Sequence, residues 1–456
     1  MDMSIQDTIF ALSSAAGKAG VSVVRVSGSK AWNTLEVLSA GKNLPEPNMA
    51  KLMKLIDPKT LDIIDHTLVI GFKAPASFTG EDIVEYHCHG AIAVIDEMLA
   101  ALGAMEGCRM AEPGEFTRRA FENNKMDLTE AEAVADLIDA ETAQQKNQAL
   151  AQMGGALANL YNDWAHDLTK ALAYVEAIID FPDEDVPDSE TAKALPAIEK
   201  ITAEIADHLN DNRRGEMLRS GIQVAVIGAP NAGKSSLVNA LAQRDVAIVS
   251  DMAGTTRDII EVHLNLGGYP VILADTAGLR PDQLGAGGHD DIESEGIKRA
   301  LKRAEDADIR LLVLDGTKKE HDAHTLNLVN DQSLILINKS DHLDGTKEVQ
   351  IAGQKPLYIS TVSGDGLNEF LKALGEKISD LMGKRSSSDT PSLTRRRHRT
   401  ALEEAFEYLA LAKQQSAPDL MAEELRSALR AIGRITGRVD VEDLLDVIFR
   451  DFCIGK

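Results

Sequence analysis

The segment Gly228–Ser235 constrains the fold of this chain most, because its residues require a strand before them and a helix after them. It reads Gly-Ala-Pro-Asn-Ala-Gly-Lys-Ser and matches the phosphate-loop pattern G-x-x-x-x-G-K-[ST]. An apolar run over 222–227 precedes it, and a helical run over 236–241 follows it. Glycines let backbone N–H groups turn inward around phosphates, and the helix N-terminus adds a favourable field. The segment therefore predicts a phosphate-binding strand, loop and helix.

The region around this loop alternates between buried-type strands and helical stretches. Strand patterns at 222–227, 271–274, 310–314, 334–337 and 356–359 are separated by helical spacing. Near-continuous apolar strands joined by helices are typical of a mainly parallel sheet covered on both faces. We expect a P-loop α/β domain over residues 216–380.

Four side chains and one backbone N–H are candidates for contacts with phosphate and Mg²⁺. Lys234 is expected to reach the outer phosphates, and the Ser235 hydroxyl is expected to bind Mg²⁺. Asp275, at the end of a buried strand, reaches Mg²⁺ through water, while the Gly278 N–H holds the terminal phosphate. Thr256, between the phosphate loop and Asp275, is our choice for a second hydroxyl on Mg²⁺.

The run Asn338-Lys339-Ser340-Asp341 ends another strand and predicts which base is bound. A carboxylate at Asp341 accepts two hydrogen bonds from the N–H edge of guanine, which adenine does not offer. A base lacking those donors leaves the carboxylate unpaired and is rejected. Ser360, after the strand at 356–359, is placed to complete the base pocket. The sequence thus favours GTP over ATP.

Leu279 follows Gly278, where small signalling GTPases place a glutamine that orients water. An aliphatic side chain does not orient water, so another group must do so, and an arginine or a cation must meet the transition-state charge. The Asn231 amide oxygen is a candidate ligand for a monovalent cation. A turn-stabilising asparagine is the alternative.

The rest of the chain predicts a multidomain protein. Residues 1–118 mix short strands, such as 21–26 and 67–72, with helices and predict an α+β domain. Apolar residues at steps of three or four predict one long amphipathic helix over 150–179 and another over 195–209. We expect helical segments at 119–215 and 381–456, with the P-loop domain inserted between them.

The charge balance limits how nucleic acid is bound. Among 456 residues, 48 Lys and Arg stand against 72 Asp and Glu, a net charge of −24 that repels phosphate backbones. Any nucleic acid must therefore meet a local basic patch or a partner. The cluster Arg395–Arg399 is the candidate patch; the alternatives are that it caps a helix or pairs with acidic helices.

The cysteines, the amino-terminal residues and the apolar runs indicate in which cellular compartment the protein is found. Cys88, Cys108 and Cys453 are too few and too widely spaced for a disulfide framework, which favours a reducing compartment. Asp2 and Asp7 argue against a signal peptide, and no apolar run approaches the about 18 residues of a membrane span. We expect a cytoplasmic protein.

Several motifs together resemble one family over essentially the whole chain, the MnmE (TrmE) tRNA-modification GTPases. The motifs that carry the resemblance, besides the nucleotide motifs, are Asp7-Thr-Ile, Ser77–Asp82 with His87–Gly90, Glu112–Phe121, Leu128–Thr142, Ile179–Glu184 and the terminal Phe452–Lys456.

The resemblance implies an amino-terminal domain that dimerises and binds 5-formyl-tetrahydrofolate or a related folate. The residues that the resemblance assigns to folate binding are Arg25, Glu85, Lys125 and Lys456. The resemblance also implies a heterotetramer with the flavoprotein MnmG. In this complex the two proteins together install a carboxymethylaminomethyl-type group at carbon 5 of the wobble uridine of certain tRNAs.

The resemblance further implies hydrolysis stimulated by K⁺, with the ion held by Asn231 and by Ser250, Met252 and Thr255. Glu293 aligns with the residue that positions the attacking water. The spacer 281–292 is longer than is usual in the family, so Asp290 and Asp291 are rivals, and an acidic helix start is a further alternative.

Lys234, Thr256 and Glu293 are thus the expected catalytic residues. Those expected to contact GTP are Asn231, Ala232, Gly233, Lys234, Ser235, Ser236, Ser250, Thr255, Thr256, Asp275, Thr276, Ala277, Gly278, Asn338, Lys339, Asp341, Ser360 and Thr361; Thr361 replaces the family's usual alanine.

Two further sites and one further function stay open. Glu85, His87 and His89 alternate on a strand and are candidate metal ligands, with hydrogen-bonded structural histidines as the alternative. Cys453 is a candidate nucleophile or thiol near the folate, or a small apolar filler. A regulatory GTPase switch in ribosome assembly, without chemistry on RNA, is the alternative function.

Overall fold

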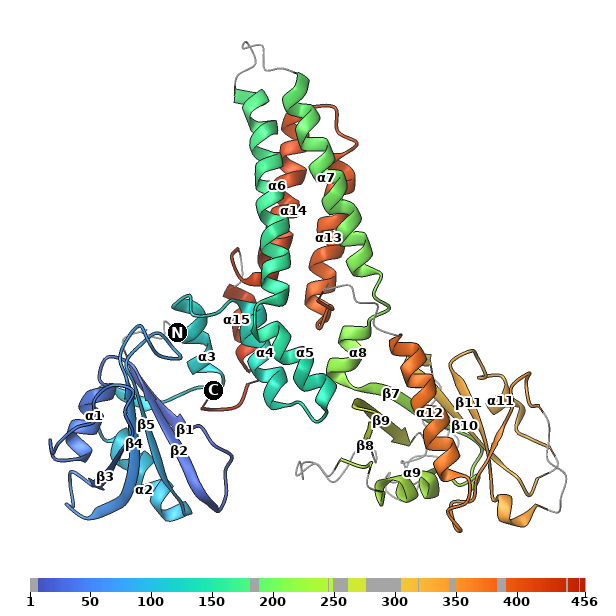
Figure 1. Ribbon diagram of the computed structural model, residues 1–456, viewed down its shortest axis with the longest axis horizontal. Helices are drawn as coiled ribbons and strands as arrows, with labels where there is room; N and C mark the ends of the chain where they lie inside the picture. The colour runs from blue at the N-terminus through green and yellow to red at the C-terminus, as the bar shows by residue number, and fades with distance from the viewer. Residues whose placement is uncertain are drawn as a thin grey trace, which may run out of the picture. The chain divides into compact units, whose positions relative to one another are not determined.

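The chain forms two compact units. The computed structural model describes residues 7–180, 188–244, 246–248, 261–275, 305–318, 320–343, 350–383, 391–439, 442–450 and 452–455 (Figure 1). One unit comprises Met1–Ala135, Gln152–Thr202 and Glu404–Lys456, and the other comprises Asp136–Ala151 and Ala203–Glu403. The multidomain α/β class is confirmed, with an α+β region, long helices and a P-loop-type sheet.

A mixed six-stranded sheet begins the first unit. Its strands are β1 (Thr8–Leu12), β2 (Ala19–Ser27), β3 (Lys51–Ile56), β4 (Ile63–Phe72), β5 (Ile83–Gly90) and β6 (Cys108–Met110). They lie in the order β3-β4-β5-β2-β1-β6, and every neighbouring pair is antiparallel except β1 and β6. The expected strands at 21–26 and 67–72 lie within β2 and β4.

Strand β1 is buried on both of its faces. Phe10 packs in the cluster that contains side chains of α1 (Ala31–Leu38) and α2 (Ile92–Gly103). Its neighbour Ile9 packs instead against Phe116 of α3 (Glu115–Glu122). Because successive strand residues point to opposite faces, α3 covers the face that α1 and α2 leave open at β1.

Ion pairs join α3 to this sheet. Arg109 of β6 donates two hydrogen bonds to the Glu115 carboxylate, at 2.8 and 2.6 Å. Arg119 donates to the same carboxylate at 2.9 Å and to Glu81 at 3.2 Å. Burial opposes ionisation of Glu115, but the hydrogen bonds from both arginines and a backbone N–H lower the pKa of this carboxyl below its usual range. The charges of the segment Glu112–Phe121 therefore hold a buried helix in place.

One sequence prediction is wrong at residues 150–179, where the chain passes from the second unit into the first. The single helix expected over 150–179 is two helices, α5 (Ala143–Met153) and α6 (Ala156–Asp180). Gly155 lies between them at φ +81°, a left-handed conformation that glycine adopts without a Cβ clash. Helix α6 packs along α14 (Pro418–Thr436) (Figure 1).

The second unit contains the expected mainly parallel sheet. Its strands are β7 (Ile222–Ile227), β8 (Glu261–Leu266), β9 (Tyr269–Asp275), β10 (Ile309–Asp315), β11 (Ser333–Asn338) and β12 (Leu357–Tyr358). They lie in the order β12-β11-β10-β7-β9-β8, and only β8 is antiparallel to its neighbour. The edge strand β8, joined to β9 by Gly267-Gly268, was not among the predicted strands.

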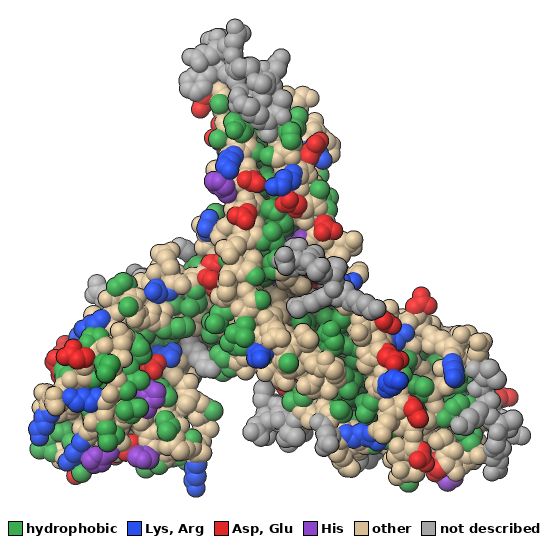
Figure 2. Space-filling view, in the orientation of Figure 1, with side chains coloured by type: hydrophobic (Ala, Val, Ile, Leu, Met, Phe, Trp, Pro, Cys, Tyr) green, Lys and Arg blue, Asp and Glu red, His purple; other side chains and the backbone are tan. Residues whose placement is uncertain are grey.

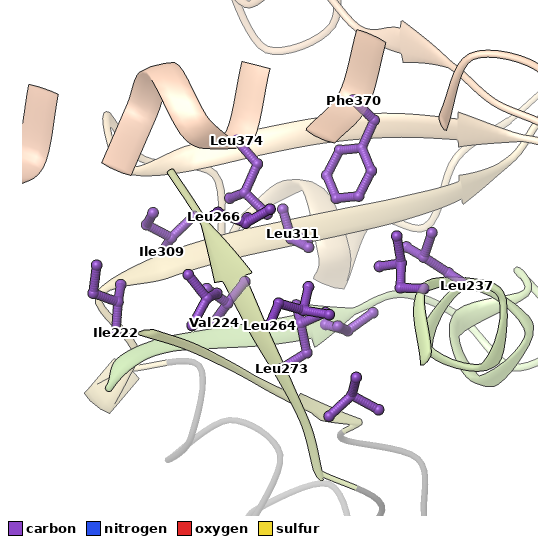
Figure 3. Packing of buried hydrophobic residues seen from close by; sticks show 14 of the residues in the cluster. Ile222, Val224, Leu237, Leu264, Leu266, Leu273, Ile309, Leu311, Phe370 and Leu374 are labelled. Atoms are coloured by element: carbon purple, nitrogen blue, oxygen red, sulfur yellow. The ribbon is translucent and has the colours of Figure 1, made fainter. Parts of the chain in front are cut away.

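A hydrophobic core fixes this sheet against its helices. Leu237 of α9 (Lys234–Ala242) and Phe370 and Leu374 of α12 (Leu367–Met382) pack with strand side chains such as Val224 and Leu311 (Figure 3). Full burial of one such side chain contributes about 1.5–3 kcal/mol. The helix that follows the phosphate loop is thereby anchored through its apolar face.

The described residues also form several other helices and a 3₁₀ turn. They are α4 (Leu128–Ile138), α7 (Asp188–Leu209), α8 (Arg214–Ser220), α11 (Ala323–Leu326), the 3₁₀ turn η2 (Ser340–His342), α13 (Arg396–Ala412) and α15 (Glu442–Arg450).

Within the second unit, the segment 136–151 contacts α8, which precedes the phosphate loop's strand, and β8 at the edge of the sheet. Gln145 and Gln148 of α5 donate side-chain hydrogen bonds to backbone carbonyls of α8, at 3.1 and 3.2 Å. Glu141, just before α5, lies 2.9 Å from the Nδ1 atom of His263 on β8. This segment therefore holds both the helix that precedes β7 and the hairpin at the sheet edge.

Replacing Arg119 by Met leaves the Glu115 and Glu81 carboxylates without one of their partners. Breaking a buried ion pair costs about 3–5 kcal/mol, and we expect the free energy of unfolding of the first unit to fall by that amount. Urea unfolding followed by circular dichroism measures it. Arg118→Met is the matched control: Arg118 pairs with Glu122 and Asp446 nearer the surface, so we expect a loss of about 1 kcal/mol or less. Equal losses for the two variants would contradict the role of burial.

Candidate nucleotide-binding site

The carboxyl ends of four parallel strands meet at one edge of the second sheet. Val226, two residues before the phosphate loop, pairs in register with Asp275, the last residue of β9. On the other side, Asp315 at the end of β10 pairs with Asn338 at the end of β11. Ligands of open α/β sheets bind at this edge. The predicted phosphate, metal and base residues of the described strands thus lie along one line of strand ends.

The phosphate loop requires its glycines because other groups approach closely. A Cβ at Gly228 would lie 2.2 Å from the Val313 carbonyl oxygen. Gly233 has φ +96°, and a Cβ there would lie 2.0 Å from the Asn338 amide nitrogen. The buried Lys234 ammonium donates to the carbonyls of Gly228 and Ala229, at 2.8 and 3.1 Å. The lysine therefore lies inside the turn of its own loop, as phosphate binding requires.

The polar side chains of this loop face outward. Ser235 and Ser236 are exposed in the first turn of α9, and Ala232 is buried beneath the loop. Asn231 is exposed and has φ +63°, a left-handed conformation in which asparagine is favoured among residues with a side chain. This conformation accounts for an asparagine in the turn whether or not its amide oxygen binds an ion.

Asn338 connects the phosphate loop to the loop of Ser360 and Thr361, which we call the base loop. Its amide nitrogen donates to the Ala232 carbonyl at 2.9 Å, and its amide oxygen accepts from the Thr361 N–H at 3.2 Å. The side chain is buried, so both hydrogen bonds are shielded from water. The amide thereby ties the end of β11 to the two loops on either side of it.

Asp341 and Ser360 lie together, as the base-pocket prediction requires. A hydrogen bond from the Ser360 side chain lowers the pKa of the Asp341 carboxyl below its usual range. Ser360 is buried, and its hydroxyl also accepts from the Ser363 N–H at 3.1 Å. Asp341 is therefore held as a carboxylate, the form that accepts hydrogen bonds from two N–H groups of guanine.

Asp315 is a residue that the sequence analysis did not select. Its carboxylate lies 2.7 Å from the Lys339 ammonium, and Thr317 donates to it from both its backbone and its hydroxyl. Burial opposes ionisation, yet these hydrogen bonds lower the pKa of Asp315 to about 2. The signal in the sequence was its position at the end of a buried strand, which Asp275 shares.

Several predicted residues lie outside the described part of the chain. They are Ser250, Met252, Thr255, Thr256, Thr276, Ala277, Gly278, Asp290, Asp291, Glu293 and Lys456.

In the first unit, the structure brings two of the four expected folate residues, Arg25 and Glu85, into contact. Arg25 of β2 lies 2.8 Å from Glu85 of β5, and its guanidinium lies over the rings of Phe78 and Phe116. The Lys125 ammonium donates to the Pro75 carbonyl at 3.0 Å, in the same loop that carries Phe78. Cationic, acidic and aromatic groups thus gather beside the loop between β4 and β5.

The histidines of β5 are each close to a carboxylate. His89 Nδ1 lies 2.8 Å from Asp65, and His87 Nε2 lies 3.5 Å from Glu85, which Arg25 already engages. In the described part of the chain, no three His, Cys, Asp or Glu side chains are grouped as a metal site. His89 therefore fits the alternative of a hydrogen-bonded structural histidine, whereas the buried His87 Nε2 atom has no hydrogen-bond partner among the described residues.

The carboxyl-terminal tail lies on the first sheet. Ser13, just after β1, donates to the Gly455 carbonyl at 2.8 Å, and Ile454 forms an isolated bridge with Pro113. Cys453 is exposed and is not part of a disulfide in the described part of the chain, whereas burial raises the pKa of the Cys88 thiol to about 11. Of these two thiols, Cys453 is the accessible one, which argues against its being an apolar filler.

The basic cluster Arg395–Arg399 is largely engaged with carboxylates. Arg395 lies 2.7 Å from Asp136, and Arg399 contacts Asp211 and Glu216 at 2.6 and 2.9 Å. These contacts support the alternative that the cluster pairs with acidic neighbours. On the face shown in Figure 2, Lys and Arg side chains are scattered among Asp and Glu rather than gathered into one basic surface.

No helix in the described ranges has the length and apolar character needed to cross a membrane.

Comparisons with known proteins match the whole chain to one family. A model described as the MnmE helical domain matches residues 128–453, and one described as the GTP-binding protein TrmE N-terminus matches residues 8–125. Proteins named tRNA modification GTPase MnmE are 52% identical in Parvibaculum lavamentivorans, 49% in Paramagnetospirillum magneticum and 45% in Rickettsia rickettsii. Each of these alignments covers 99% of this chain and 100% of the relative.

Among solved structures, the G domain of the T. maritima FeoB iron transporter aligns with 36% of this chain and 99% of its own length, at 28% identity. Its TM-score of 0.25 is too low to support a conclusion. The two family models and the full-length identities agree with the resemblance inferred from the motifs. This chain belongs to the MnmE (TrmE) family.

Proposed function

We propose that this protein hydrolyses GTP and that hydrolysis serves the modification of tRNA. The enzyme class follows from the family, whose members at 45–52% identity are named tRNA modification GTPases. The observation that carries the proposal is the Asn338 amide, which contacts the phosphate loop and the base loop at once. It sets Lys234 and Asp341 at a fixed separation, as recognition of a whole guanine nucleotide requires.

The described residues fit a magnesium-bound triphosphate. Ser235 is an exposed residue in the first turn of α9, and Asp275 is the last residue of the neighbouring strand β9, so two residue types whose oxygens Mg²⁺ prefers occur at one edge of the sheet. Bound Mg²⁺ would neutralise phosphate charge, with Thr256 as a second hydroxyl ligand. Lys234 holds the outer phosphates, and the loop N–H groups orient them.

We assign the water-positioning role to Glu293, with Thr256 and Lys234 as the other catalytic residues. K⁺ would be held by the Asn231 amide oxygen and by backbone carbonyls of Ser250, Met252 and Thr255. The exposed amide of Asn231, beside the phosphates' expected position, supports this assignment. A cation there would supply the positive charge that an arginine supplies in other GTPases.

The first unit is proposed to bind a folate and to dimerise. Arg25, Glu85 and Lys125, with Lys456, suit the polar edge of a pterin and the carboxylates of its glutamate tail. Leu52 of β3 and Leu68 of β4 pair in register on the sheet face opposite the α1 and α2 core and are 69% and 40% exposed. Exposed apolar patches mark interfaces, which supports a homodimer through this face.

The tRNA chemistry is proposed to need a flavoprotein partner of the MnmG type, in a heterotetramer. The product is a carboxymethylaminomethyl-type group at carbon 5 of the wobble uridine. A net charge of −24 and the pairing of Arg395 and Arg399 with carboxylates fit a chain that meets tRNA together with such a partner. We propose that the protein acts in the cytoplasm. We also propose that the chain is divided into an α+β domain (1–118), two helical segments (119–215 and 381–456) and a P-loop GTPase domain (216–380).

Replacing Asp341 by Asn tests base recognition. Two hydrogen bonds to a charged group contribute about 1.5–3 kcal/mol each, so we expect affinity for GTP to fall by about 100- to 10,000-fold. Affinity for xanthosine triphosphate should rise, because an amide N–H donates to the carbonyl at position 2 of xanthine. Calorimetric titration measures both, with Asp331→Asn on a surface turn as control. Unchanged GTP affinity in Asp341→Asn would refute the assignment.

Replacing KCl by NaCl tests the cation. We expect GTP hydrolysis to slow by about 10- to 100-fold, because a charge partner of the transition state is lost. In Asn231→Ala the difference between the two salts should disappear, while GDP affinity stays close to that of the wild type. Phosphate release under both salts measures the effect, and equal wild-type rates would count against a potassium site.

Nucleoside analysis of tRNA tests the biological role. In a strain lacking this protein, the group at carbon 5 of the wobble uridine should be absent. Wild type and Lys372→Ala, which changes an exposed lysine of α12, should restore it, and Lys234→Ala should not. Normal wobble uridine in the deleted strain would favour the ribosome-assembly switch instead.

A further inference from the structure

Asp315 is the last residue of β10, and Lys339 directly follows the neighbouring strand β11. Asp315 of β10 pairs in register with Asn338 of β11, and the Gly316 N–H donates to the Asn338 carbonyl at 2.9 Å. A Cβ at Gly316 would lie 2.8 Å from that carbonyl oxygen, so the turn after β10 depends on glycine for this approach. The turn therefore contacts the start of the loop Asn338–Asp341 directly.

The Asp315 carboxylate is held in one orientation. Its Oδ1 atom accepts from the Thr317 backbone N–H at 3.0 Å and from the Thr317 hydroxyl at 2.7 Å. This leaves Oδ2 for the Lys339 ammonium, at 2.7 Å. The Asp315 side chain is only 9% exposed. Each oxygen thus has its own partner, and the ion pair is largely shielded on the aspartate side.

Lys339 has a backbone conformation that needs such support. Its φ is +62°, in the left-handed region that is unfavourable for a residue with a Cβ. Such conformations persist where the surroundings hold them, and they cluster at functional sites. The His342 N–H donates to the Lys339 carbonyl at 3.0 Å, and Asp315 holds the other end of the residue.

We propose that Asp315 is a positioning residue for guanine-nucleotide binding, which acts by holding Lys339 and so fixing the loop that carries Asn338 and Asp341. Asn338 immediately precedes Lys339 and contacts the phosphate loop, and Asp341 follows two residues later and contacts Ser360. Loss of the ion pair frees the residue between these two contacts. This inference rests on the proposed function, because it concerns the same site.

The expected consequence is faster release of nucleotide with little change in the chemical step. The Asp315 carboxylate contacts Thr317 and Lys339, neither of which is assigned to phosphate, metal or water, so the kcat for GTP hydrolysis should stay within about twofold. KM for GTP and the rate of GDP release should rise together. A partly exposed ion pair contributes about 1 kcal/mol, which corresponds to about a fivefold change.

The test compares Asp315→Asn with Asp322→Asn by the release of fluorescently labelled GDP from the full-length protein. Asparagine still accepts from Thr317 but presents no charge to Lys339. Asp322 follows the same strand and caps α11 through Thr325, so its variant loses a structural carboxylate without touching Lys339. We expect about fivefold faster release from Asp315→Asn only. Equal rates in wild type and Asp315→Asn would overturn the inference.

A double-mutant cycle separates positioning from general loosening. In a Lys339→Met background, Asp315→Asn should change GDP release no further, whereas the same fivefold factor there would overturn the inference. If Asp315→Asn shows no cooperative thermal unfolding, Thr317→Val replaces it; faster release supports the inference, and a wild-type rate overturns it. Failure of the wild type to bind labelled GDP would refute the proposed function itself, and with it this inference.

Discussion

The buried amide of Asn338 is the contact on which the nucleotide site depends. It satisfies a carbonyl of the phosphate loop and an N–H of the base loop with one side chain, in a place without competing water. Gly233 leaves the room that this amide occupies. The backbone hydrogen bonds of the parallel sheet already fix the positions of the strand ends. The Asn338 amide therefore needs only to align the two short loops that follow them. Recognition of phosphate and of base is thereby coupled through a few atoms.

The two units stabilise their functional residues by different means. In the P-loop unit, apolar strands and the inner faces of α9 and α12 form one core, and the polar groups lie at the strand ends. Around α3, charged groups are buried and paired, with Glu115 between Arg109 and Arg119. A buried ion pair is sensitive to loss of either partner, since the remaining charge stays desolvated. The same segment, Glu112–Phe121, was among the motifs that carried the family resemblance.

Much of this arrangement could be predicted from the sequence, and the failures have physical reasons. Gly228–Ser235 and Asn338–Asp341 each combine a short motif with a preceding apolar strand, so their placement followed from local rules. The prediction of one helix over 150–179 was wrong because the apolar spacing continues through Gly154-Gly155, although Gly155 takes a left-handed conformation that ends the helix. The strand β8 was missed, although Gly-Gly between alternating residues signals a hairpin. The Asp315–Lys339 pair depends on strand order, which no local pattern contains.

The β8–β9 hairpin has a position that makes it more than an edge of the sheet. In sequence it follows the segment that includes Thr256, and it ends at Asp275. On its outer side, His263 meets Glu141, and the Gly268 carbonyl accepts from the Gln144 N–H at 3.4 Å. A displacement of this hairpin must either carry α5 with it or sever the Glu141–His263 contact. Since α5 also donates hydrogen bonds to α8 through Gln145 and Gln148, the hairpin is connected through α5 to the helix that precedes β7.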